Sequence, residues 1–191
     1  MDEARGWRPQ TIRRGGKAAE IRDPILEPWW TGTRVLAIYS EGPNWREFGT
    51  LEVMDTDGGD ASQIAPQAIE LLARSIRARD AVVDGILTCE TLAGEKQELS
   101  EPGFVGLDLL TIDGQRLLDV PLLERKRLLE GAIAQSDLVR VSPWARPPVR
   151  SWFESWRRAG FRGLVIKEAN SRYVPGSQTT EWVIVDKRPD R

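Results

Sequence analysis

Residues 27–34 read Glu-Pro-Trp-Trp-Thr-Gly-Thr-Arg, and the chain becomes strand-like directly after them. Residues 35–40 and 48–54 are short runs rich in the side chains that favour β-strands. Between these two runs stands Gly42-Pro43-Asn44, a sequence typical of the turn in a β-hairpin. The stretch therefore predicts an antiparallel hairpin that begins just after residue 34.

Strands predominate in the rest of the chain, with three helices between them. One apolar face recurs with α-helical spacing from Ala65 to Ile76, which predicts a helix over these residues. Pro121 is well placed at the start of a second helix, and Pro148 and Gly160 bracket a third. Further strands are predicted at residues 81–88, 104–111, 138–141, 161–167 and 182–186. This order favours an α+β domain with mostly antiparallel sheets.

The composition is typical of one globular domain. The chain has 191 residues, of which 40% are hydrophobic and 29% are charged. No apolar stretch approaches the roughly 20 residues needed to span a bilayer, and the polar N-terminus lacks the apolar segment of a signal peptide. Cys89 is the sole cysteine, which excludes an internal disulfide and favours a reducing, cytoplasmic location.

The absence of histidine limits the chemistry that the chain can perform. Without that side chain, histidine-based general acid–base catalysis and Ser-His-Asp triads are excluded. Histidine-ligated metal sites are excluded for the same reason.

Charge is unevenly distributed although the net charge is only −2. Between residues 140 and 162 there are six arginines and one acid, Glu154. Such a stretch is either a solvated surface or a phosphate-binding face, and its best nucleic-acid-binding candidates are Arg146, Arg150, Arg157 and Arg158. Trp152 and Trp156 lie four residues apart on the predicted third helix, a spacing that would allow stacking on bases. With Phe153 beside them, burial against a sheet is favoured.

A series of segments, in order along residues 20–187, resembles the motifs of ATP-dependent DNA ligases, closest to the bacterial type that joins breaks in DNA. Residues 27–34 are similar to the family's first motif, Glu-Pro-Lys-Trp-Asp-Gly-x-Arg. Several ordered segments are far more specific than any single match. The others are residues 82–87, 106–114, 117–126, 162–167, 171–176 and 182–186.

The resemblance implies the fold of the DNA ligase and mRNA capping enzyme nucleotidyltransferases, an ATP-grasp-like domain. This is an α+β fold of mostly antiparallel sheets flanked by helices. We expect residues 1–20 to form a polar N-terminal arm and residues 21–188 to form the ligase adenylation-like domain, with no OB-fold.

The resemblance also shows which positions have changed. In the family, a lysine attacks the α-phosphate of ATP, glutamates hold the ribose and the divalent metal, and further lysines neutralise the phosphate. The replacements are Trp29 for the nucleophilic lysine, Ile86 and Arg162 for the glutamates, Ile184 and Asp186 for the other lysines, and Leu107 for the aromatic residue that stacks on adenine. An indole cannot form the bond to AMP. We therefore expect no catalytic residue, no metal site and no cofactor, although the family uses ATP and Mg²⁺.

A binding pocket could remain despite these replacements. Glu27, Arg34 and Lys167 match family positions that contact adenine, ribose and phosphate, so they are the candidates for residual nucleotide binding. The alternative is that Glu27 and Arg34 pair locally. In either case we expect Trp29 to fill the old nucleotide cavity.

Three functions follow from these observations. The first is a catalytically inactive ligase-like domain that acts by binding. Its partner would be nicked or single-stranded DNA, a DNA repair protein or an intact ligase, and no membrane. The second is a sensor that binds a nucleotide non-covalently. The third is an active nucleotidyltransferase or DNA ligase with a relocated lysine, for which Lys167 is the candidate that the motifs place near the site.

Overall fold

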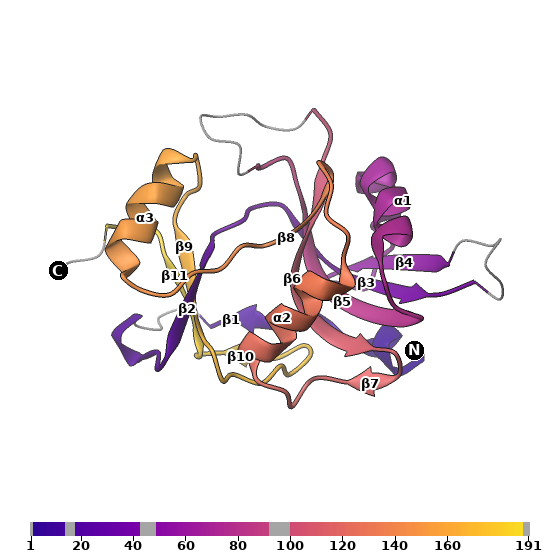
Figure 1. The fold of residues 1–191 in the computed structure, drawn as a ribbon, viewed down its shortest axis with the longest axis horizontal. Coiled ribbons are helices and arrows are strands. Elements are labelled where there is room, and N and C mark those ends of the chain that lie inside the picture. The colour runs from indigo at the N-terminus through magenta and orange to yellow at the C-terminus, as the bar shows by residue number, and fades with distance from the viewer. Residues whose placement is uncertain (1, 14–17, 43–48, 92–99, 189–191) are drawn as a thin grey trace.

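The computed structural model describes residues 2–13, 18–42, 49–91 and 100–188. Two sheets stand side by side, the larger next to helix α1 (Pro66–Ser75) and the smaller next to helix α3 (Val149–Arg158), as Figure 1 shows. Helix α2 (Leu122–Ala132) runs along the larger sheet and reaches the smaller one. The predicted α+β class with mostly antiparallel sheets is confirmed.

The larger sheet has six strands among the described residues, in the order β4-β3-β5-β6-β7 with β8 beside β6. All neighbours are antiparallel except β6 and β8, which run parallel. The strands are β3 (Thr33–Ser40), β4 (Thr50–Asp55), β5 (Asp80–Thr88), β6 (Gly103–Ile112), β7 (Gln115–Arg116) and β8 (Val139–Val141). The predicted pairing of the first two strands is confirmed, and most of the predicted turn lies outside the described residues.

Strand β3 is buried on both faces, which explains its nearly unbroken apolar sequence. Val35 and Ala37 face the core beneath α1 and the end of α2. Leu36 and Ile38 face the opposite core, in which Trp7 and Tyr173 also pack. The larger sheet is therefore the central layer of the domain.

The smaller sheet is antiparallel, in the order β11-β9-β2, and its strands are β2 (Pro24–Pro28), β9 (Leu164–Glu168) and β11 (Trp182–Val185). A third core joins it to α3 and to the larger sheet, since Phe153 and Trp156 pack there together with Ile86. The site described below lies where the two sheets face each other.

The N-terminal segment is not a free extension. It contains a 3-10 helix, Asp2–Gly6, and strand β1 (Thr11–Ile12), which pairs in parallel with β10 (Gln178–Thr179). Ala4 and Trp7 are buried in the core beside β3. A second 3-10 helix, Ala18–Glu20, precedes β2, and a third, Ser62–Ile64, precedes α1. No helix of the described residues is long and apolar enough to cross a membrane.

Candidate functional site

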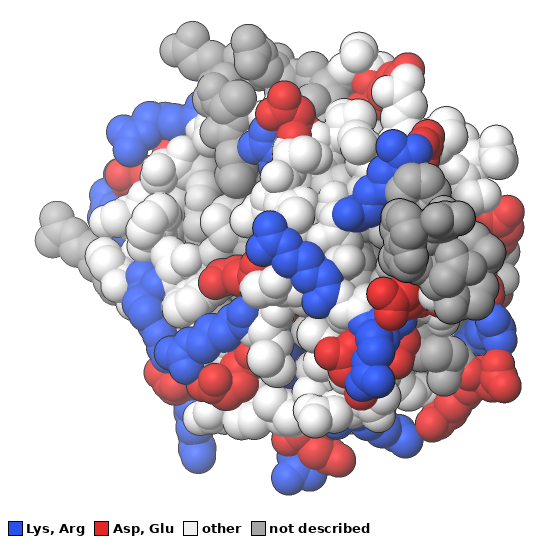
Figure 2. All heavy atoms as spheres, turned by 45° about the vertical axis from the view of Figure 1, so that its right-hand side comes forward, with Lys and Arg blue, Asp and Glu red and all other residues white. Residues whose placement is uncertain are grey.

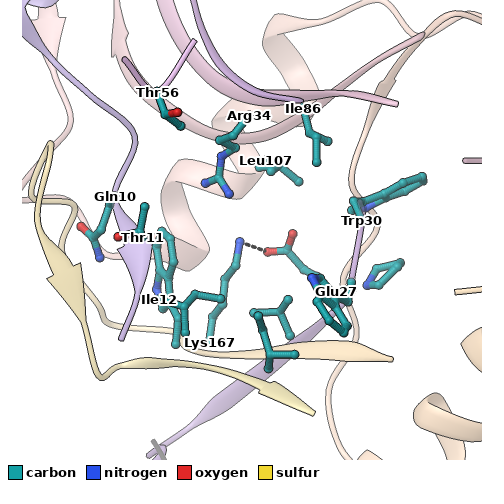
Figure 3. Close-up of a pocket in the computed structure, with 15 residues that line it drawn as sticks. Gln10, Thr11, Ile12, Glu27, Trp30, Arg34, Thr56, Ile86, Leu107 and Lys167 are labelled. Atoms are coloured by element: carbon teal, nitrogen blue, oxygen red, sulfur yellow. Dashed lines mark ion pairs between the residues drawn. The ribbon is translucent and has the colours of Figure 1, made fainter. Parts of the chain in front are cut away.

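A cavity of about 270 Å³ opens between the two sheets, and Figure 3 shows the side chains around it. The three predicted nucleotide contacts, Glu27, Arg34 and Lys167, all line this cavity. Four of the replaced motif positions line it as well: Trp29, Ile86, Leu107 and Ile184. The sequence motifs therefore converge on one place, although they are spread over more than 150 residues.

Glu27 is a buried acid that lines the cavity, and together with Lys126 and Lys167 it forms a charged cluster that we call the floor. Its partner in the β2–β9 ladder is Val165, so Lys167, two residues further along β9, lies on the same face of the sheet. The Lys167 Nζ is 2.8 Å from Glu27 Oε1, and the Nζ of Lys126 on α2 is 3.4 Å from Glu27 Oε2. Burial by itself raises the pKa of Glu27, but the two ammonium groups outweigh it, so the pKa lies below its usual range.

The two lysines of the floor differ in their surroundings. Lys126 is fully buried and donates to the backbone carbonyls of Leu107 at 3.3 Å and Ser142 at 3.1 Å. Burial lowers the pKa of Lys126, although Glu27 acts in the opposite direction. Lys167 faces the cavity and lies 4.7 Å from the centroid of the Trp182 ring, a cation–π distance.

Arg34 enters the cavity from the larger sheet and is paired with Asp84. Its Nε and Nη2 donate to the two carboxylate oxygens of Asp84 at 2.5 and 2.6 Å. Asp84 is buried and also accepts from the Tyr173 hydroxyl at 2.7 Å. Burial lowers the pKa of Arg34, but Asp84 overrides this effect and the pKa is raised; burial and Asp84 both raise the pKa of Tyr173.

Local pairing thus accounts for much of the charge at the site. Both Glu27 and Arg34 have partners in the protein, as the alternative interpretation of the sequence holds. The arrangement still leaves room, because Trp29 is half-buried and lines the cavity without filling it. The expectation that the indole fills the cavity is wrong.

Two replaced positions do not join the cavity lining. Arg162 is exposed and lines a separate hollow of about 330 Å³ together with Thr31 and Cys89. Asp186 is exposed just beyond the end of β11. Arg162 therefore does not bring a positive charge to this cavity.

Other contributors could not be located from the motifs. Lys126 joins Glu27, although the motifs place only Lys167 near the site. Its signal is the Leu-Glu-Arg-Lys sequence at the start of α2, which fixes Lys126 by helix register. Gln10, Thr11 and Ile12 reach the cavity from the N-terminal segment, and nothing in the sequence signals this.

The predicted nucleic-acid-binding arginines lie on or next to α3, and most have a local partner. Arg146 pairs with Asp23 at 2.5 Å, Arg150 with Glu154 at 3.2 Å, and Arg157 donates to the carbonyl of Arg162 at 3.0 Å. Arg158 is exposed and has no partner among the described residues. The same helix exposes an indole, Trp152, which packs on buried Trp156 with ring centroids 5.3 Å apart. The prediction of burial is confirmed for Trp156 and wrong for Trp152.

Elsewhere the surface charges are mixed. On the face shown in Figure 2, acidic and basic side chains are interspersed and form no continuous basic area. Acidic and basic side chains also pair on exposed surface, as in Arg5–Glu52 and Arg74–Glu70. The part of the chain that the structure describes holds no group of three or more cysteine or acidic side chains placed to bind a metal ion.

Comparisons with known proteins agree with this arrangement. Residues 66–185 match the family model described as ATP dependent DNA ligase domain. The chain is 27% identical over 192 residues to a DNA ligase of Thermococcus fumicolans, covering 87% of this chain and 34% of that protein. It is 26% identical over 166 residues to the multifunctional non-homologous end joining DNA repair protein LigD of Mycobacterium tuberculosis, covering 83% of this chain and 21% of that protein.

Solved structures share the fold. The ligase domain of M. tuberculosis LigD superimposes with a TM-score of 0.72 at 23% identity, covering 94% of this chain and 59% of that one. A Chlorella virus DNA ligase-adenylate superimposes with a TM-score of 0.60 at 13% identity, covering 95% of this chain and 67% of that one. The chain spans about a third or less of the length of these two curated relatives.

Proposed function

Since this chain belongs to the ATP-dependent DNA ligase family, we propose that it is a catalytically inactive adenylation-type domain that acts by binding. Its partner is nicked or single-stranded DNA, or a protein of DNA repair. It takes no metal ion and forms no covalent bond to AMP. The motifs of this chain and the geometry of its cavity both support this loss of catalysis.

One observation carries the proposal: three positions around the cavity at which the resembled family uses charged side chains are apolar here. Trp29 stands at the position of the nucleophile, and Ile86 and Ile184 stand at two further positions on the opposite walls. None of these side chains can attack phosphorus, hold a divalent metal or neutralise a phosphate. Adenylate transfer needs all three functions at once.

The lysines that remain at the site are poor substitutes for the missing nucleophile. A nucleophilic amine must be neutral and must reach the phosphate. Lys167 Nζ already lies 2.8 Å from the Glu27 carboxylate and 4.7 Å from the centroid of the Trp182 ring, so contacts within the protein engage it. Lys126 is fully buried and already donates to two carbonyls. Relocation of the nucleophile to either lysine is therefore not supported.

The surface of α3 supports the DNA version of the proposal. Arg150, Arg157 and Arg158 are exposed along the helix, and Trp152 is exposed on the same helix. Arginine can bind phosphate through two parallel hydrogen bonds, and an exposed indole can stack on an unpaired base. Since three of the four candidate arginines already have protein partners and the net charge is −2, we expect affinity no better than roughly micromolar and a steep loss with salt.

Fluorescence anisotropy with labelled nicked, intact and single-stranded DNA tests this version. At low salt, we expect the wild type to bind nicked or single-stranded DNA, and Arg150→Ala combined with Arg158→Ala to weaken binding without unfolding the domain. The matched control is Arg127→Ala on α2, which removes an exposed arginine that also pairs with an acid on its own helix. If the wild type binds no DNA at low salt, the DNA version fails and a protein partner takes its place.

A second function has one observation in its favour, namely the open cavity beside Glu27 and Arg34. A domain that kept this space could bind a nucleotide non-covalently. Calorimetric titration with ATP, with and without Mg²⁺, tests this function. Binding that strengthens with Mg²⁺ would favour a nucleotide sensor over the proposal above.

A further inference from the structure

We propose that the cavity between the two sheets binds a small aromatic carboxylate, and that it prefers such a compound to a nucleoside triphosphate. The inference rests on the proposed loss of nucleotidyl transfer, because it assigns a different ligand class to the same cavity. Three features carry it: the apolar walls of the cavity, the hydrogen-bond donors of Arg34 and Lys167, and the net charge of the site.

The walls favour a flat apolar ligand. Ile86 and Leu107 are buried and line the cavity from the larger sheet, as Figure 3 shows. Trp29, directly after β2, and Ile184 on β11 line it as well. Apolar walls with a few converging polar groups are typical of small-molecule sites. The volume of about 270 Å³ lies below the range of drug-sized ligands, which begins at about 300 Å³, and this favours a compound of one or two rings.

Two cationic groups provide donors at the polar end of the cavity. In Figure 3 the Arg34 guanidinium and the Lys167 ammonium approach the same space from opposite sheets. Lys167 is 4% exposed and pairs with one oxygen of Glu27, so an ammonium with three donors keeps capacity for a ligand. Arg34 uses Nε and Nη2 for Asp84, and its Nη1 has no partner among the described residues. A carboxylate placed between them would accept hydrogen bonds from both sides.

The charge of the site matches one negative charge on the ligand. Glu27 is a single carboxylate between two ammonium groups, Lys126 and Lys167, while Arg34 is balanced by Asp84. One positive charge is therefore left over in a buried setting, and a monoanion compensates it. A triphosphate brings several negative charges and needs a metal ion, for which Glu27 is not free because both of its oxygens face lysines.

Isothermal titration calorimetry with four probes tests the proposal: 2-naphthoate, its neutral analogue 2-naphthamide, AMP, and ATP with Mg²⁺. We expect 2-naphthoate to bind at least about tenfold more tightly than 2-naphthamide, because the amide cannot compensate the positive charge. We expect AMP and ATP with Mg²⁺ to bind more weakly than 2-naphthoate.

Two variants locate the binding site. Lys167→Gln should weaken 2-naphthoate at least about tenfold and leave 2-naphthamide nearly unchanged, with folding checked by circular dichroism. Ile184→Trp, at a rim position that is 37% exposed, should block both naphthyl compounds. The control for the added indole is Leu128→Trp, because Leu128 is similarly exposed on α2 and lies outside the cavity lining.

Three other outcomes of the titrations would overturn the inference. Equal binding of acid and amide would show that the cationic groups do not recognise the ligand. Tighter binding of ATP with Mg²⁺ would return the cavity to the nucleotide class, and no binding of any probe at millimolar concentration would show that it has no ligand of this kind. An AMP adduct on the protein would refute the proposed function alone, since the affinity for 2-naphthoate is measured without ATP.

Discussion

The floor and the walls of the cavity differ in what they retain. On the floor, Glu27, Lys126 and Lys167 are charged, buried and paired across α2, β2 and β9. On the walls, Trp29, Ile86 and Ile184 are apolar at positions where the resembled family uses charge. We propose that the floor keeps its charges because they contribute to the packing of the domain, whereas the walls have lost theirs together with adenylate transfer.

Two glycines of the motifs support this interpretation. A Cβ atom on Gly85 would lie 2.4 Å from the ring of Phe104, and one on Gly163 would lie 2.1 Å from the carbonyl oxygen of Val185. These close approaches leave no space for a side chain, so both glycines serve the packing of the sheets. They remain in two motifs in which Ile86 and Arg162 stand where the resembled family has glutamate.

The largest expected effect on stability comes from removing the negative charge of Glu27 from the floor. Glu27→Gln leaves two buried ammonium groups without their common counter-ion, which should lower the free energy of unfolding by about 3–5 kcal/mol. Urea denaturation measures this loss, with Ile184→Val at the exposed rim as the wall control, expected to cost less than about 1 kcal/mol. A loss below 1 kcal/mol for Glu27→Gln would show that the floor charges do not hold the fold.

The pH dependence of stability, compared between the wild type and Glu27→Gln, tests the charge of Glu27 separately. The pKa of Glu27 is lowered below its ordinary value of 4.5, so its ionised form stabilises the folded state above that pH. This stability is lost as the pH falls through the lower pKa of the folded state, at about 1.4 kcal/mol for each unit of the shift. The stability difference between wild type and Glu27→Gln should therefore be full at pH 7 and smaller at pH 3. An unchanged difference would contradict the ionised assignment of Glu27.

On the walls, Trp29→Lys should have a smaller effect on stability and no effect on chemistry. Because Trp29 is half-buried, we expect a loss of about 1–2 kcal/mol in the free energy of unfolding. The restored lysine should give neither adenylation nor ligation, because Ile86 and Ile184 stay apolar and such groups act as a unit. Trp152→Lys on exposed α3 controls for the loss of an indole. Efficient AMP transfer by Trp29→Lys would show that the rest of the site is competent.

The smallest effect on stability should come from the surface arginines. Arg150 pairs with Glu154 on an exposed face of α3, so Arg150→Ala should change the free energy of unfolding by less than about 0.5 kcal/mol. Denaturation at low and high salt measures it. A loss above 1 kcal/mol would mean that this pair belongs with the floor charges, and that the surface is not free to bind a partner.

Much of the fold could be predicted from the sequence because its elements carry local signals. The hairpin strands, the apolar face of α1 and the start of α2 at Pro121 depend on side-chain spacing within a few residues. The ordered motifs also place Glu27, Arg34 and Lys167 together, as the structure has them. Their role in binding a nucleotide stays a prediction.

The rest of the site depends on long-range pairing that has no local signal. The parallel contact between β1 and β10 brings Ile12 to the cavity across more than 160 residues. The Arg34–Asp84 pair is set by the register of β3 and β5, and the outward position of Arg162 by the turn after α3. Residue type alone could not distinguish a free arginine from a paired one.

Intact-mass analysis after incubation with ATP and Mg²⁺ tests the central claim most directly, with a catalytically competent ligase treated in parallel as the positive control. If the walls have lost adenylate chemistry, the mass of this protein stays unchanged while the control gains one AMP. An added AMP, mapped by peptide analysis to Lys167, Lys126 or any other lysine, would contradict the account.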